Sequence, residues 1–281
     1  MSNDTSSGVG VGIGGGSSVS EQVTIFIRLA QGAFVFLASG LVAAAILRYK
    51  QLRERKELLV ICALCVADSI HGLARFSSGI NRASYALLGL SHLKIDQREC
   101  VSRPHYWLYV VGIGASAFLY LAVAVDRLLA TALPLRYFSW TTDYGKRLVL
   151  LFAAMSAADT VMLILSNRFT EGKGGIFILC LNNQAIGSRT VASVHSTILS
   201  AVQVATIVIY LAIPFLYKKN YKTLGREKAQ AERAARQRHL LITMGITALV
   251  VFSTQSATTF FRLFIAGRLG WALPSITHCY H

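Results

Sequence analysis

Six long apolar segments decide what this chain can fold into. Crossing the hydrocarbon core of a bilayer takes about 20 apolar residues in helical conformation, and each segment reaches that length. No stretch of the chain alternates apolar and polar residues in the manner of a membrane β-barrel. We therefore predict an all-α membrane protein with helices at 25–47, 58–79, 106–130, 148–166, 197–217 and 240–264.

The two ends of the chain, before and after the apolar segments, differ sharply in composition from those segments. Residues 1–22 are rich in glycine and serine, and a segment of this kind buries too little apolar surface to become ordered. We predict a disordered extracellular tail over 1–22, a transmembrane bundle over 23–265 and a short C-terminal remnant over 266–281. The remnant is too short and too polar to form a further span.

Basic residues are unevenly divided between the loops, and this division predicts the orientation. The chain has 28 lysines and arginines against 13 acidic residues, a net charge of +15. The loops after the first, third and fifth segments hold 16 of the basic residues, whereas the two intervening loops hold seven. The more basic loops face the cytoplasm, so we expect the N-terminus outside, where Asn3 heads a glycosylation sequon. Because the positive charge lies in loops between apolar helices, we expect no nucleic-acid partner.

An acidic and a basic residue stand together at the predicted cytoplasmic end of the third segment. Asp126 is followed directly by Arg127, and Pro134 and Leu135 come seven residues after this pair. The carboxylate can hold the guanidinium in an ion pair, and releasing it would free the arginine for another partner. The alternative is a simple cytoplasmic anchor with a local counter-charge.

The second segment carries three ionisable residues along one helical face. Asp68, His71 and Arg75 are separated by three and four residues, which places them above one another on a helix. A charge at this depth costs about 3 kcal/mol or more without a partner or water. Asp68 and Arg75 are about two turns apart, so His71 or water would have to bridge them. The stripe is either purely structural or lines a polar cavity.

These two groups of residues carry a family resemblance. Leu64, Ala67 and Asp68 in the second segment and the Asp126-Arg127 pair in the third resemble the rhodopsin-like G-protein-coupled receptors. The chain looks most like the nematode serpentine chemoreceptors of the Srsx class. The resemblance implies a rhodopsin-like bundle of seven helices, of which six are visible. The missing seventh helix leaves two explanations open: the sequence is a truncated gene model, or it is a receptor relic that does not signal.

The resemblance also implies a function. A small-molecule or peptide ligand outside the cell would activate a heterotrimeric G protein across the plasma membrane, without catalysis and without a cofactor. Asp68 would line a central cavity that holds sodium or water, and Cys100 and Cys180 would form a disulfide. The residues of the activation switch would be Asp126, Arg127, Pro134, Leu135 and Tyr210.

Depth in the membrane gives a first set of ligand contacts. Tyr109, Ile113 and Gln203 lie in the outer third of the predicted bundle, so we predict that they line the ligand pocket.

The sequence leaves other classes of function open. A transporter or channel would use Asp68, His71, Arg75 and Asp159 as a conduction path, and an assembly protein would need no ligand.

Catalysis finds no support in the pattern of polar residues. His195 and Ser196 are adjacent, but a base must face its nucleophile and be oriented by a third group. The sequence shows no acidic residue near His195, so we expect no catalytic triad and no enzyme.

Overall fold

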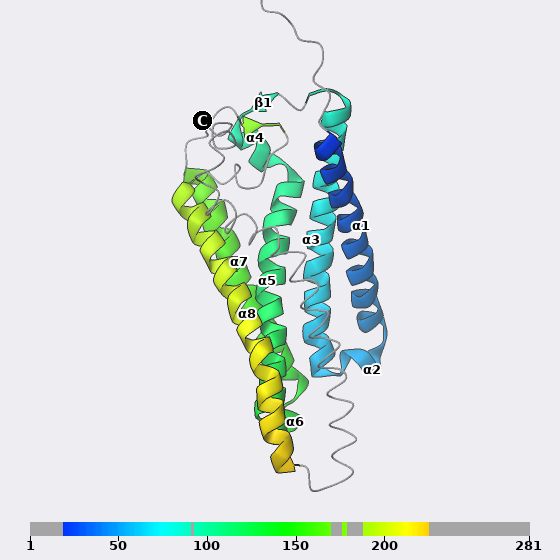
Figure 1. Ribbon diagram of the computed structural model, residues 1–281, viewed down its shortest axis with the longest axis vertical. Helices are drawn as coiled ribbons and strands as arrows, with labels where there is room; N and C mark the ends of the chain where they lie inside the picture. The colour runs from blue at the N-terminus through cyan, green and yellow to red at the C-terminus, as the bar shows by residue number, and fades with distance from the viewer. Residues whose placement is uncertain (1–18, 91–92, 170–175, 179–187, 225–281) are drawn as a thin grey trace, which may run out of the picture. The chain divides into compact units, whose positions relative to one another are not determined.

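The computed structural model describes residues 19–90, 93–169, 176–178 and 188–224 (Figure 1). Their secondary structure is almost entirely helical. The chain separates into two compact units: the first holds residues up to Asp126 together with Phe138–Ile207, and the second holds Arg127–Tyr137 and the chain from Val208 onward. The long helices are α1 (Val19–Arg48), α3 (Lys56–Leu87), α5 (Pro104–Ala132), α7 (Thr142–Phe169) and α8 (Arg189–Leu224).

Five helices in the described part of the chain are long and apolar enough to cross a membrane. They are Ile25–Arg48, Lys56–Leu87, Pro104–Ala132, Thr142–Phe169 and Thr190–Lys218. The predicted all-α architecture is thereby confirmed for the residues that the structure describes. The sixth predicted segment, 240–264, lies outside these residues, and the orientation in the membrane remains a prediction.

The helices extend beyond the apolar segments at both ends. α1 begins at Val19, inside the predicted tail, and α3 continues to Leu87, eight residues past the predicted end at residue 79. α5 and α6 (Pro134–Ser139) each begin with a proline, which fits the first turn of a helix because its missing N–H has no partner there. Pro214 lies inside α8, where membrane helices tolerate it.

α1 and α3 pack against each other at glycines on both helices, joined by the short helix α2 (Lys50–Arg53). A β-carbon added to Gly32 would lie 2.6 Å from the backbone nitrogen of Phe76, and one added to Gly72 would lie 2.5 Å from that of Phe36. Figure 1 shows the two helices side by side in blue and cyan. Small residues let membrane helices approach to backbone contact, and here they do so on both partners.

The main apolar core of the first unit gathers around α5. Its buried residues come from four helices: Val60 and Ala67 of α3, Ala117, Phe118, Leu119, Ala122 and Val123 of α5, Leu148 and Phe152 of α7, and Leu199 and Val202 of α8. α5 is the most buried of the five spans and α1 the least. On α1, Phe34 is 72% exposed and Leu41 71% exposed, as expected of side chains that face lipid.

A two-stranded sheet, absent from the sequence predictions, lies where α3 ends and α5 begins. β1 (Lys94–Ile95) pairs antiparallel with β2 (Ile176–Phe177), and the Ile178 amide donates to the Leu93 carbonyl at 2.8 Å. The short helix α4 (Gln97–Ser102) follows β1. We call this end of the first unit the β1–β2 end, and by the predicted orientation it faces the outside.

Candidate functional site

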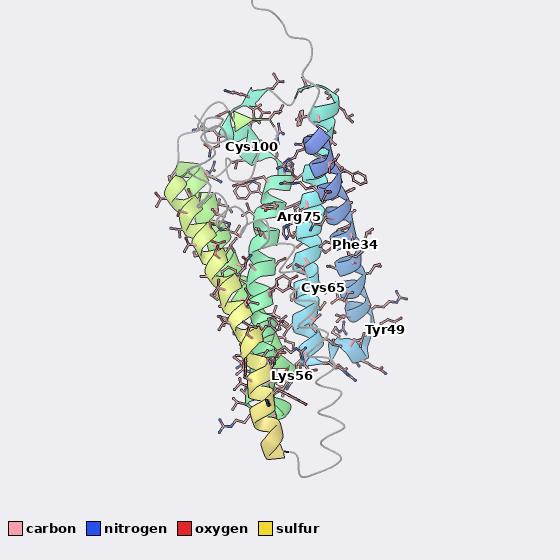
Figure 2. The ribbon with its side chains drawn as sticks, in the orientation of Figure 1. Phe34, Tyr49, Lys56, Cys65, Arg75 and Cys100 are labelled. Atoms are coloured by element: carbon pink, nitrogen blue, oxygen red, sulfur yellow. The ribbon has the colours of Figure 1, made fainter. Side chains whose placement is uncertain are left out.

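The three ionisable residues predicted on the second segment lie on α3, and two of them, Asp68 and His71, meet side chains from α5. Arg75 donates from Nε to Nε2 of His71 at 3.0 Å, so His71 accepts there and carries its proton on Nδ1. The His71 ring stands edge-on to Tyr109, with centroids 5.4 Å apart. In Figure 2, Arg75 is labelled on α3 between Cys65 and the β1–β2 end.

Asp68 is bound from α5 as well. Tyr120 donates its hydroxyl to Asp68 Oδ2 at 2.8 Å, and Ser116 lies beside the same carboxyl. Asp68 Oδ1 and Ser116 Oγ are buried and close enough to interact, but neither makes a hydrogen bond of good geometry within the described part of the chain. Buried polar atoms are costly when they lack a partner, so this pair of oxygens fits a water molecule or a small monovalent cation.

A glycine brings α5 close enough for these contacts. A β-carbon on Gly112 would lie 2.7 Å from the Cα of His71 and 2.8 Å from its nitrogen. His71 is only 2% exposed, because two helices come into backbone contact with α3 around it. Gly112 lets α5 approach on one side, and Gly32 lets α1 approach at the neighbouring Gly72 on the other. The close packing fixes the ring that holds Arg75.

Ser116 and Tyr120 were not predicted from the sequence as members of this site. A signal for them does exist: Tyr109, Gly112, Ser116 and Tyr120 are spaced by three or four residues and therefore share one face of α5. These polar and small residues interrupt an otherwise apolar helix, and their face is the one that meets α3.

A second polar pair joins α7 to α8 inside the first unit. His195 Nδ1 lies 2.9 Å from Asp159 Oδ2 and 3.1 Å from Oδ1, and the two side chains are 12% and 4% exposed. The predicted lack of an acidic residue near His195 is wrong, because Asp159 stands 36 positions earlier in the chain. Gly114 of α5 lies next to this pair: its β-carbon would come 3.7 Å from Asp159 Oδ2.

Within the described residues, this pair is not part of a catalytic triad. Asp159 orients His195, but the adjacent Ser196 is exposed and forms no hydrogen bond with His195 within the described residues. Within the described residues, His195 therefore has an orienting acid but no nucleophile hydrogen-bonded to it that would complete a triad. In the described residues there is also no group of three or more metal-binding side chains.

The predicted switch residues fall at the boundary of the two units. Asp126 ends its part of the first unit, is 1% exposed and lies within electrostatic range of Tyr144 on α7. Arg127 begins the second unit, where Thr131 donates its hydroxyl to the Arg127 carbonyl at 2.9 Å.

The other predicted coupling residues belong to the second unit. Pro134 begins α6 and is partly buried, and Tyr210 is a partly buried residue of α8. The Leu135 side chain lies outside the described residues. Two residues further on, Tyr137 is 1% exposed, and its backbone amide donates to the Leu133 carbonyl at 2.8 Å.

The predicted ligand contacts lie at different places in the first unit. Tyr109 contacts His71, Ile113 packs against the main apolar core, and Gln203 is partly buried on α8. Their common role in a ligand pocket stays a prediction.

The predicted disulfide and glycosylation site depend on residues that the structure does not describe. Cys100 is fully buried and packs with Tyr106 and Leu163. Cys100 takes part in a disulfide, but Cys180 and Asn3 lie outside the described residues, so the Cys100–Cys180 pairing and the glycosylation remain predictions. Cys62 and Cys65 are free thiols, and the Cys62 thiol points to the Ala43 carbonyl at 3.9 Å.

Comparison with known protein families gives one result. No individual curated protein matches the chain. A family model described as serpentine type seven-transmembrane G-protein-coupled chemoreceptor Srsx matches residues 34–269. That range covers most of the 281 residues and includes every residue of the two polar groups and the Asp126-Arg127 pair. The chain therefore belongs to the Srsx family of serpentine chemoreceptors.

Proposed function

We propose that this chain is a chemosensory receptor that binds an extracellular ligand and activates a heterotrimeric G protein at the plasma membrane. The observation that carries the proposal is the burial of Asp126, 1% exposed, directly before Arg127 at the end of a membrane helix. A buried carboxylate in a membrane protein needs a partner and marks a functional site. Membership of the chemoreceptor family supports the same function.

In the proposed mechanism, the ligand acts by shifting an equilibrium between two states. A ligand that binds one state more tightly raises the population of that state by its difference in affinity. In the active state Arg127 becomes available to the G protein, Tyr210 is its partner on α8, and Pro134 and Leu135 contact the G protein from α6. The basic loops face the cytoplasm in this scheme, and the β1–β2 end receives the ligand.

Nucleotide exchange on a purified G protein tests the proposal without knowledge of the ligand. The receptor is reconstituted in nanodiscs, and its basal stimulation of GTPγS binding is measured over a range of receptor concentrations. We expect Arg127→Ala to abolish the stimulation and Asp126→Asn to raise it, because the second change removes the charge that holds the guanidinium. Arg53→Ala is the matched control, since Arg53 is an exposed basic residue of α2. Equal stimulation by the wild type and Arg127→Ala would refute the proposed switch.

One observation favours a second candidate, a transporter or channel. Asp68, His71 and Arg75 on α3 and the Asp159–His195 pair place ionisable groups inside membrane spans, as in proton and ion pathways. A flux assay in proteoliposomes separates the two functions. Proton or sodium flux that Asp68→Asn abolishes would establish the transporter. A receptor gives no such flux.

A further inference from the structure

The side chain of Arg75 is held in place but has most of its hydrogen-bonding capacity unused. Its Nε donates to His71, and the guanidinium has four further N–H groups on its two terminal nitrogens. Within the described part of the chain, no hydrogen bond or ion pair within 4 Å is made by these terminal nitrogens. The residue is partly exposed rather than sealed in the core, so the terminal N–H groups are open to an incoming group.

The nearest acidic residue on the same helix, Asp68, lies within electrostatic range of Arg75 but forms no direct ion pair with it. Asp68 is bound to Tyr120, and no ion pair joins Asp68 to Arg75 among the described residues. The charge of Arg75 lies inside a membrane span, where an unpartnered charge costs about 3 kcal/mol or more. A negatively charged partner at the terminal nitrogens would offset that cost.

Further basic residues follow Arg75 toward the β1–β2 end. Arg82 lies seven residues later on α3, on the same helical face, and is 6% exposed. Arg103 packs its guanidinium over the Tyr85 ring at 5.2 Å and is ion-paired with Glu99. Arginine side chains therefore lie between Arg75 and the β1–β2 end.

Two acidic residues of the described chain lie at the β1–β2 end next to these arginines. Glu99 is exposed and pairs with Arg103 at 3.4 Å, and Asp96 is exposed at the start of α4. An incompletely bonded guanidinium with further arginines on the same side favours the binding of an anion.

We propose that Arg75 is the anchor for an oxyanion group, a carboxylate, sulfate or phosphate, carried by the ligand of this receptor. The planar fork of an arginine matches such a group with two parallel hydrogen bonds, and the bond to His71 sets the direction of the fork. Tyr109, which stands against His71, supplies an aromatic surface for an apolar part of the same ligand. The ligand class rests on the proposed receptor function, whereas the anion site itself is measured without a G protein.

Sulfate is the probe for the site. The full chain in neutral phosphatidylcholine nanodiscs is titrated with sodium sulfate, at an ionic strength held constant with sodium chloride, and the thermal midpoint is recorded. We expect a saturable rise of several degrees for the wild type, no rise for Arg75→Gln and a weaker one for Arg75→Lys, which keeps the charge and loses the fork. Arg53→Gln, in an exposed basic residue of α2, should respond like the wild type.

The outcomes separate the possible sources of the anion. An equal response of wild type and Arg75→Gln, or no response of the wild type, would overturn the site. The titration is repeated in nanodiscs that contain phosphatidylserine. If the midpoint rises there in an Arg75-dependent way and sulfate has no further effect, Arg75 binds a lipid headgroup. That result would overturn the proposal that Arg75 binds a soluble ligand. A sulfate response without any stimulation of GTPγS binding would uphold the anion site and refute the receptor function, so the two failures remain distinct.

Discussion

Gly72 of α3 and Phe36 of α1 lie so close that a β-carbon on Gly72 would stand 2.5 Å from the Phe36 backbone nitrogen. Backbone cannot move aside as a side chain can, so we expect Gly72→Ala to force the helices apart and to cost about 1–3 kcal/mol, as overpacking does. The thermal midpoint of the purified protein measures this loss.

Gly40→Ala is the matched control at the same interface. Its β-carbon would meet only the Ser69 hydroxyl, at 3.3 Å; this side chain donates to the Phe36 carbonyl at 3.3 Å and needs to shift by only a few tenths of an ångström, and alanine is the better helix former. The control should be neutral or slightly stabilising. Equal midpoints for Gly72→Ala and the wild type would show that the α1–α3 contact is looser than the structure gives.

The Asp159–His195 pair should respond unequally to loss of either member. His195→Ala leaves a carboxylate 4% exposed without its partner, and such a change costs about 3–5 kcal/mol in a protein interior. Asp159→Asn removes the charge and keeps a hydrogen-bonding oxygen beside the ring, so we expect the smaller loss. Unfolding in a mixed-detergent titration gives both values. A larger loss for Asp159→Asn than for His195→Ala would contradict the pairing.

The unbonded oxygens of Asp68 and Ser116 predict a stabilising effect of sodium. Replacing N-methylglucamine by sodium at ten times the dissociation constant should stabilise the protein by about 1.4 kcal/mol. Asp68→Asn should remove this effect and Ser116→Ala should weaken it. Asp96→Asn changes an exposed carboxylate and should leave the effect intact. If Asp68→Asn keeps the full sodium response, the two oxygens bind water alone.

The predicted Cys100–Cys180 disulfide can be tested by a double-mutant cycle. Cys100 is fully buried, and removal of a disulfide costs about 2–5 kcal/mol. Cys100→Ser and Cys180→Ser should each lower the midpoint, and the double variant should be no less stable than the worse single one. Cys65→Ser, in a free thiol of α3, controls for loss of a cysteine. Additive losses from the two single variants would exclude the bond.

Features that depend on composition or on nearby residues could be predicted from the sequence. Length and apolarity suffice to identify the five described spans, since a membrane helix satisfies all its backbone hydrogen bonds within itself. The shared face of Asp68, His71 and Arg75 follows from helical spacing alone. The Asp126-Arg127 pair is contiguous in the chain and needs no tertiary information.

Contacts between helices could not be predicted in the same way. Tyr120 reaches Asp68 across 52 positions and His195 reaches Asp159 across 36. Helical spacing shows which residues share a face but not which other helix that face meets. The glycine contacts have the same property, because nothing in the sequence assigns Gly72 to Gly32 or Gly112 to His71. The small β1–β2 pair has two residues in each strand, too few for a periodic signal.

The glycine contact between α1 and α3 has a consequence for biosynthesis. The two helices are consecutive spans joined by the four-residue helix α2, and the atoms nearest to Gly32 and Gly72 belong to these two helices. Membrane helices insert first and associate afterwards, and a nascent chain grows at about 5–20 residues per second. We therefore expect α1 and α3 to associate while α5 is still being translated, and to offer the emerging helix a finished surface that already carries Asp68, His71 and Arg75.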